Sequence, residues 1–81
     1  MAKYFFHLRD GDDVLLDPEG VDLPDAAAIA AKALYEARSI LSHDLMKGSI
    51  KLDQRIDVEE AAGKVVHSLD FCDAIEILPA P

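Results

Sequence analysis

Polar and hydrophobic residues alternate along residues 3–9, as in an extended strand with two different faces. One face carries Tyr4, Phe6 and Leu8, and the other carries Lys3, Phe5, His7 and Arg9. The turn signal Asp10-Gly11-Asp12 follows, and Val14-Leu15-Leu16 supplies a short returning strand. The pattern therefore predicts a β-hairpin, which Pro18-Glu19-Gly20 ends.

The next segment has helical periodicity. Residues 26–46 are rich in alanine and contain neither Gly nor Pro, which favours an uninterrupted helix. Asp25 is placed to cap this helix, after a possible short extended stretch at 21–23, and Gly48 is placed to stop it. The face predicted to lie on the sheet carries Ala30, Ala33, Leu34, Ala37, Leu41 and Leu45, and the opposite face carries Lys32, Glu36, Ser39, His43 and Lys47.

A second alternating pattern follows the helix. Residues 52–59 place Leu52, Ile56 and Val58 inward and Asp53, Arg55, Asp57 and Glu59 outward. Residues 60–63 turn the chain, and 64–69 return as the other half of a hairpin. The sequence thus predicts one α+β domain over residues 1–81, of order β-β-α-β-β, in which one long helix packs on one face of an antiparallel sheet.

The C-terminal segment has two interpretations. Residues 71–78 fit either a helical turn that stacks Phe71 on Ile75 or a last strand in which Ile75, Glu76 and Ile77 alternate. Pro79 and Pro81 end ordered structure in both cases.

Composition narrows the classes of function. The chain has 81 residues and a net charge of -8, so nucleic acid and anionic membranes are not expected partners. One cysteine, no signal-peptide pattern and no apolar stretch of membrane-spanning length indicate a soluble protein of the cytoplasm. A domain of this size buries only about two-thirds of its surface, which raises the expectation of a homodimer or another protein partner.

The candidate metal ligands are not spaced as in known calcium or zinc sites. The acids between Asp10 and Asp25 form a cluster, but Gly11 directly follows the first acid, which does not fit an EF-hand loop. The other candidate ligands are His7, His43, His67 and Cys72, and none lies at a known zinc spacing. His7 and His67 would meet if their strands were neighbours, which leaves a small metal- or ligand-binding protein as an alternative.

Catalytic signatures are not found. No serine lies in a nucleophile elbow, and Cys72, next to Phe71 among acids, is expected to be a buried small hydrophobe rather than a thiolate. The glycines stand singly at turns, so there is no phosphate loop. We therefore expect no enzyme, no catalytic residue and no cofactor.

An interface is the remaining prediction. With one helix available, one face of the sheet stays uncovered, and Phe5 lies on that face among His7 and Arg9. An aromatic residue among cations is typical of protein interfaces, so Phe5, His7 and Arg9 are the candidate site. The predicted function is a non-enzymatic interaction module that self-associates through the open sheet face or a strand edge.

Three segments carry a resemblance to known proteins: Tyr4 to Gly11, Asp17 to Asp25 and Phe71 to Ile75. In these the chain resembles a family of short bacterial proteins that form a domain of unknown function, which implies no activity. The strands and the Leu-Pro turn before an Ala-rich helix are also similar to antitoxin domains of the HicB type. That likeness implies an antitoxin-like partner of another protein, although the chain has no room for the extra strand and DNA-binding segment those domains carry.

Overall fold

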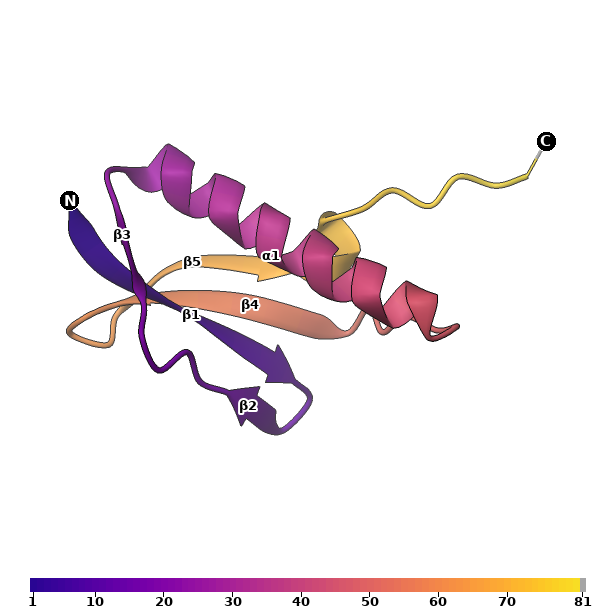
Figure 1. Cartoon of the computed structure of the whole chain (residues 1–81), viewed down its shortest axis with the longest axis horizontal. Coiled ribbons are helices and arrows are strands. Elements are labelled where there is room, and N and C mark those ends of the chain that lie inside the picture. The colour runs from indigo at the N-terminus through magenta and orange to yellow at the C-terminus, as the bar shows by residue number, and fades with distance from the viewer. Residues whose placement is uncertain (81) are drawn as a thin grey trace.

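An antiparallel sheet is built around strand β1, and one helix lies across it (Figure 1). The computed structural model describes residues 1–80. The strands are β1 (Ala2–Asp10), β2 (Asp13–Leu15), β3 (Val21–Leu23), β4 (Gln54–Glu60) and β5 (Val65–Asp70). Their order is β2-β1-β4-β5, and β3 pairs with β1 on the edge that β2 also uses.

The predicted α+β class, antiparallel sheet and single long helix are confirmed, with one addition. The short extended stretch at Val21–Leu23 is a true strand, so three strands rather than two precede the helix. The strand β2 pairs with the end of β1 and β3 with its beginning, so the connector of residues 16–20 crosses the edge between them.

Helix α1 (Ala26–Met46) has the bounds that the alanine-rich pattern predicts. Asp25 caps it, since its Oδ1 accepts a hydrogen bond from the Ala28 N–H at 2.8 Å. The residues that α1 buries are Ile29, Ala33, Ala37 and Leu41. Small alanines at the contact let the helix approach β4 and β5 closely.

Two residues of the predicted buried helix face are exposed. Ala30 points away from the sheet because Ile29, one position earlier, occupies the inward direction. Leu45 is 63% exposed because a 21-residue helix is about 31 Å long and outruns the short strands beneath it. Figure 1 shows the C-terminal turns of α1 beyond the strands.

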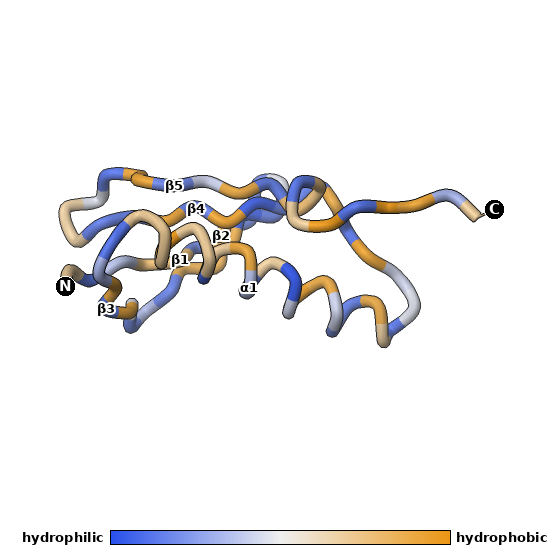
Figure 2. Tube along the Cα trace, turned by 90° about the horizontal axis from the view of Figure 1, so that it is seen from above, coloured by the Kyte–Doolittle hydropathy of each residue, from blue (hydrophilic) through white to orange (hydrophobic). Residues whose placement is uncertain are grey.

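The core lies between α1 and the sheet face below it. Its central side chains are Val58 and Phe71, both 0% exposed, with Ile56 at 2%. Along β4 hydrophobic and hydrophilic positions alternate, as Figure 2 shows. The predicted inward positions Ile56 and Val58 are confirmed, and Asp57 between them points outward as predicted but is nevertheless buried, at 4%.

The C-terminal segment adopts the helical turn rather than a last strand. Phe71–Asp73 forms a 3-10 helix, and residues 75–78 have no strand pairing. Because a 3-10 helix has about three residues per turn, Phe71 and Ala74 point inward and Cys72 outward. The prediction of a buried Cys72 is therefore wrong. Ile75 still packs against the core, and the tail after it leads away from the helix and sheet in both views (Figures 1 and 2).

Candidate functional site

The sheet face opposite α1 contains the three residues that the sequence nominated as an interface. Strand register sets Phe5 opposite Glu59, His7 opposite Asp57 and Arg9 opposite Arg55. We call this surface the open face and define it by its members: Lys3, Phe5, His7 and Arg9 of β1, Val14 of β2, Asp22 of β3, Arg55, Asp57 and Glu59 of β4, and Val65, Ser68 and Asp70 of β5.

Asp57 is the centre of a hydrogen-bonded network on the open face. Its side chain is 6% exposed and accepts bonds from Ser68 Oγ at 2.7 Å and from Arg55 Nε at 2.9 Å and Nη2 at 3.2 Å. Arg9 Nε donates a further bond to the same carboxylate. Donors thus surround both carboxylate oxygens, and two arginines neutralise one buried charge.

These contacts decide the ionisation of Asp57. Burial by itself raises the pKa of the carboxyl, but the hydrogen bonds from Ser68, Arg55 and Arg9 and the charge of Arg55 outweigh it, so the pKa lies below its ordinary value. Asp57 is therefore an anion near neutral pH. Its role is to hold both arginines down on the sheet.

His7 is buried beside this network, at 8% exposure. Its Nδ1 accepts a hydrogen bond from the Asp17 backbone N–H at 3.0 Å, so in the neutral ring the proton sits on Nε2. Nε2 lies 3.8 Å from Glu59 Oε1. The ring stacks on Phe5 with centroids 6.3 Å apart and planes 11° apart. Phe5 and His7 therefore form one flat aromatic unit on the open face.

Phe5 is half-buried, because Gly20 covers part of its ring. A side-chain carbon added at Gly20 would lie 2.9 Å from Phe5 Cε2, and the glycine has a φ of +70°. Glycine is therefore required at this position for two reasons: the positive φ disfavours other residues, and the Phe5 ring leaves no room for a side chain. The sequence predicts the face that Phe5 occupies but not this contact with the connector.

Asp17 fastens that connector to the strand edge. Its Oδ2 accepts from the Phe6 N–H at 3.1 Å, a donor that neither β2 nor β3 reaches. Its Oδ1 accepts from the N–H groups of Glu19 and Gly20, both at 3.2 Å. Burial by itself raises the pKa of Asp17. The three backbone hydrogen bonds and the nearby His7 lower the pKa by more, so it lies below its ordinary value. A carboxylate thus fills the gap between two short strands.

Asp57 was not nominated from the sequence, and Asp17 was named only as a member of the acid cluster between Asp10 and Asp25. An Asp before Pro-Glu-Gly is a weak signal for a side-chain turn, which could have indicated Asp17. Asp57 looks like any outward strand residue until the register sets it between His7 and Ser68, so the sequence held no signal for it.

The candidate metal ligands do not meet. Strand β4 separates β1 from β5, and His67 pairs with Val58, on the sheet face opposite to that of His7. His43 is exposed on the helix and Cys72 on the 3-10 turn. In residues 1–80 no three His, Cys, Asp or Glu side chains gather in a group that could hold a metal ion. The pairing of His7 with His67 that the sequence left open therefore does not form.

No helix within residues 1–80 has the length and apolar character needed to cross a membrane.

Comparisons with known proteins identify the family of the chain but not an activity. Neither the curated proteins nor the solved structures give a significant match. The resemblance to HicB-type antitoxin domains therefore stays a prediction. A family model described as a domain of unknown function, DUF6894, matches residues 3–72, and the chain belongs to this family.

Proposed function

We propose that the protein is a non-enzymatic interaction module that self-associates through the open face. One observation carries the proposal: the single helix packs on one face of the sheet, while on the other face the half-buried Phe5 stacks on the buried His7 and keeps part of its ring open to solvent. A flat aromatic centre with charged neighbours is the composition of many protein interfaces.

The charges of the open face support association despite the net charge of -8. Lys3, Arg9 and Arg55 offset three of the four acids on this face, which are Asp22, Asp57, Glu59 and Asp70, so the face carries little of the net charge. The two arginines are already paired with Asp57, and a pre-paired charge costs less to desolvate than a free one. The excess negative charge that would make two copies repel each other therefore lies mostly outside the open face.

The arrangement of charge also suits a symmetric pair. Cations Lys3 and Arg9 lie on β1, whereas β4 and β5 carry the acids Asp57, Glu59 and Asp70 with one cation, Arg55, which is paired with Asp57. A two-fold axis along the strands would lay β1 of one copy across β4 and β5 of the other, so each cationic strand would face acids twice. Burying this face would supply the apolar contact that a small two-layer domain lacks.

Light scattering coupled to size-exclusion chromatography tests the proposal. The unmodified chain should show a mass above the 8.8 kDa of one copy, rising with concentration. Phe5→Asp should return the mass to that of one copy, since it places a charge at the centre of the interface. Tyr35→Asp is the matched control, because Tyr35 is an aromatic residue 68% exposed on the helix.

A second variant keeps the test decisive if Phe5→Asp fails to fold. Lys3→Glu changes an exposed side chain on the same face and makes that face locally acidic, so it should weaken association without unfolding the domain. A mass of one copy at every concentration would refute the proposal. So would a folded Phe5→Asp protein that assembles like the unmodified chain.

A further inference from the structure

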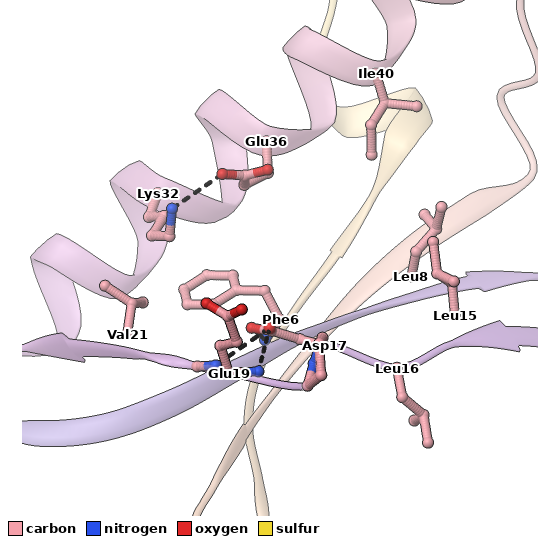
Figure 3. A pocket seen from close by; sticks show the side chains of 12 residues that line it. Phe6, Leu8, Leu15, Leu16, Asp17, Glu19, Val21, Lys32, Glu36 and Ile40 are labelled. Carbon is pink, nitrogen blue, oxygen red and sulfur yellow. Dashed lines mark hydrogen bonds and ion pairs between the residues drawn. The ribbon is translucent and has the colours of Figure 1, made fainter.

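A buried histidine helps to hold the connector of residues 16–20 on the sheet. The side chain of His7 is 10% exposed, and its Nδ1 accepts a hydrogen bond from the Asp17 backbone N–H at 3.0 Å. Asp17 Oδ2 in turn accepts a hydrogen bond from the Phe6 N–H at 3.1 Å. Dashed lines in Figure 3 mark bonds of the Asp17 carboxylate, which also binds N–H groups of the connector itself. Asp17 therefore fastens the connector to β1 through two hydrogen bonds, and only the first requires a neutral imidazole.

Protonation of His7 is incompatible with that first bond. A neutral imidazole has one acceptor nitrogen, whereas an imidazolium carries hydrogen on both nitrogens and accepts no hydrogen bond. The proton would have to enter at Nδ1, because Nδ1 is the acceptor and Nε2 already carries the hydrogen. Two N–H groups would then point at each other across 3.0 Å. Charging the ring therefore requires that either the ring or the connector moves.

The connector is the part that moves more easily. The His7 ring is nine-tenths buried and stacks on Phe5, with ring centroids 6.3 Å apart. Within the connector, by contrast, the residues Leu16, Pro18 and Glu19 are exposed. A ring that turned would lose its stack and its buried position, whereas a connector that lifted would lose few packing contacts. Protonation should therefore displace the connector.

Acidic groups face the imidazole from both elements packed against it. Strand β4 contributes Asp57, directly opposite in register, and Glu59, whose Oε1 lies 3.8 Å from Nε2. The connector contributes Asp17. The arginines of this face, Arg9 and Arg55, are both paired with Asp57. The pKa values of Asp17 and Asp57 lie below their ordinary value, so both are anions throughout the range in which histidines titrate. Nearby anions favour an imidazolium, so the hydrogen bond, and not the surrounding charge, opposes protonation.

We infer that His7 is a pH-dependent latch for the connector: the neutral ring holds residues 16–20 on β1, and protonation of the ring in mild acid releases them. The bond to Asp17 is present above the pH at which His7 titrates and is lost below it. Gly20 belongs to the connector and covers part of the Phe5 ring, so release uncovers Phe5 on the open face. The consequence for association rests on the proposed function, whereas the latch itself acts within one chain.

Nuclear magnetic resonance of the full chain between about pH 8 and pH 5 tests the latch. Near neutral pH, two-bond nitrogen–proton correlations should place the His7 hydrogen on Nε2. On acidification the Asp17 amide signal should shift with the same midpoint as the His7 ring. Protection of the Asp17, Glu19 and Gly20 amides from solvent exchange, corrected for intrinsic exchange rates, should fall about tenfold, as for the loss of one hydrogen bond. Amides of β4 and β5 should keep their protection.

Matched variants separate the latch from a general effect of acid. His7→Asn supplies an acceptor oxygen in place of Nδ1 but takes up no proton, so its connector should stay protected throughout the same pH range. His43→Asn is the control, because His43 is exposed on α1, and it should respond to acid as the unmodified chain does. If His7→Asn fails to fold, the position of the His7 hydrogen and the shared midpoint in the unmodified chain still decide the question.

Four results would overturn the inference. The neutral His7 ring could carry its hydrogen on Nδ1, or the Asp17 amide could shift with a midpoint different from that of His7. The connector could stay protected after His7 is protonated. A folded His7→Asn chain could lose protection in acid as the unmodified chain does. Each of these results is measured within one chain, so none depends on whether copies associate through the open face.

Discussion

Replacing Asp57 with asparagine removes the anion that holds the open face together. Asparagine keeps the size of the side chain and one acceptor oxygen, but its NH₂ group replaces the second oxygen. If the remaining oxygen stays on Ser68 and Arg55 Nε, the NH₂ faces the donors Arg9 Nε and Arg55 Nη2. Two acceptor positions become one, and two arginines lose their counter-charge.

The contacts set the size of the effect. Each hydrogen bond to a charged group contributes about 1.5–3 kcal/mol, so two lost bonds give an upper limit of about 3–6 kcal/mol. Arg9 and Arg55 are 35% and 47% exposed and recover part of this in water. We expect the free energy of unfolding to fall by about 2–3 kcal/mol, which for a domain of this size lowers Tm by about 10–20 °C.

The effect should depend on pH with a definite sign. The pKa of Asp57 in the folded state lies below its ordinary value of 3.8. A carboxyl with a depressed pKa stabilises the fold above its unfolded-state pKa, and this stability is lost as pH falls through the folded-state value. The difference between the unmodified chain and Asp57→Asn should therefore be full near neutral pH and shrink below pH 3.8.

Urea unfolding followed by circular dichroism at several pH values measures both quantities. Asp22→Asn is the control, because Asp22 is exposed on β3 and its side chain makes no hydrogen bond within residues 1–80. It should change stability by less than about 0.5 kcal/mol. A loss below about 1 kcal/mol for Asp57→Asn, or a difference that grows on acidification, would refute the role of this carboxylate.

Two further predictions concern close packing. Gly20→Ala should destabilise the fold by about 2–3 kcal/mol, because of the φ of +70° and the clash with Phe5. The control Gly63→Ala, with a φ of +91° and open space around it, should cost about 1 kcal/mol. Equal losses of stability in urea unfolding would show that the Phe5 contact does not matter. Ala33→Leu should lower the free energy of unfolding by about 1–3 kcal/mol, because it overfills a position that is 0% exposed. The control Ala30→Leu, on the exposed side of the helix, should leave the stability nearly unchanged. An unchanged stability in Ala33→Leu would contradict the close approach of helix and sheet.

Local patterns predicted the elements because each depends on neighbours in sequence. Alanine content, Asp25 and the absence of Gly and Pro were enough to place α1 at Ala26–Met46. Period-two alternation likewise gave β1 and β4, and the face on which Phe5 lies. The strand β3 is three residues long, too short for alternation to distinguish it from an extended loop.

Contacts between distant segments were not predictable from one sequence. The fate of Asp57 depends on the register that brings Arg9 and Ser68 to it, from 48 and 11 positions away. The separation of His7 from His67 depends on strand order, which no local pattern encodes. The same holds for the pocket between α1 and the connector of residues 16–20, since Leu15 and Ile40 line it from separate elements.

The central claim is that the open face is an interface between copies of this chain. Nuclear Overhauser contacts in an equimolar mixture of isotope-labelled and unlabelled chains report only intermolecular neighbours. The account predicts intermolecular contacts from the Phe5 ring to residues of β4 and β5, and their loss in Lys3→Glu. No intermolecular contacts at concentrations used for such spectra, or contacts confined to Tyr35 and its helix face, would contradict it.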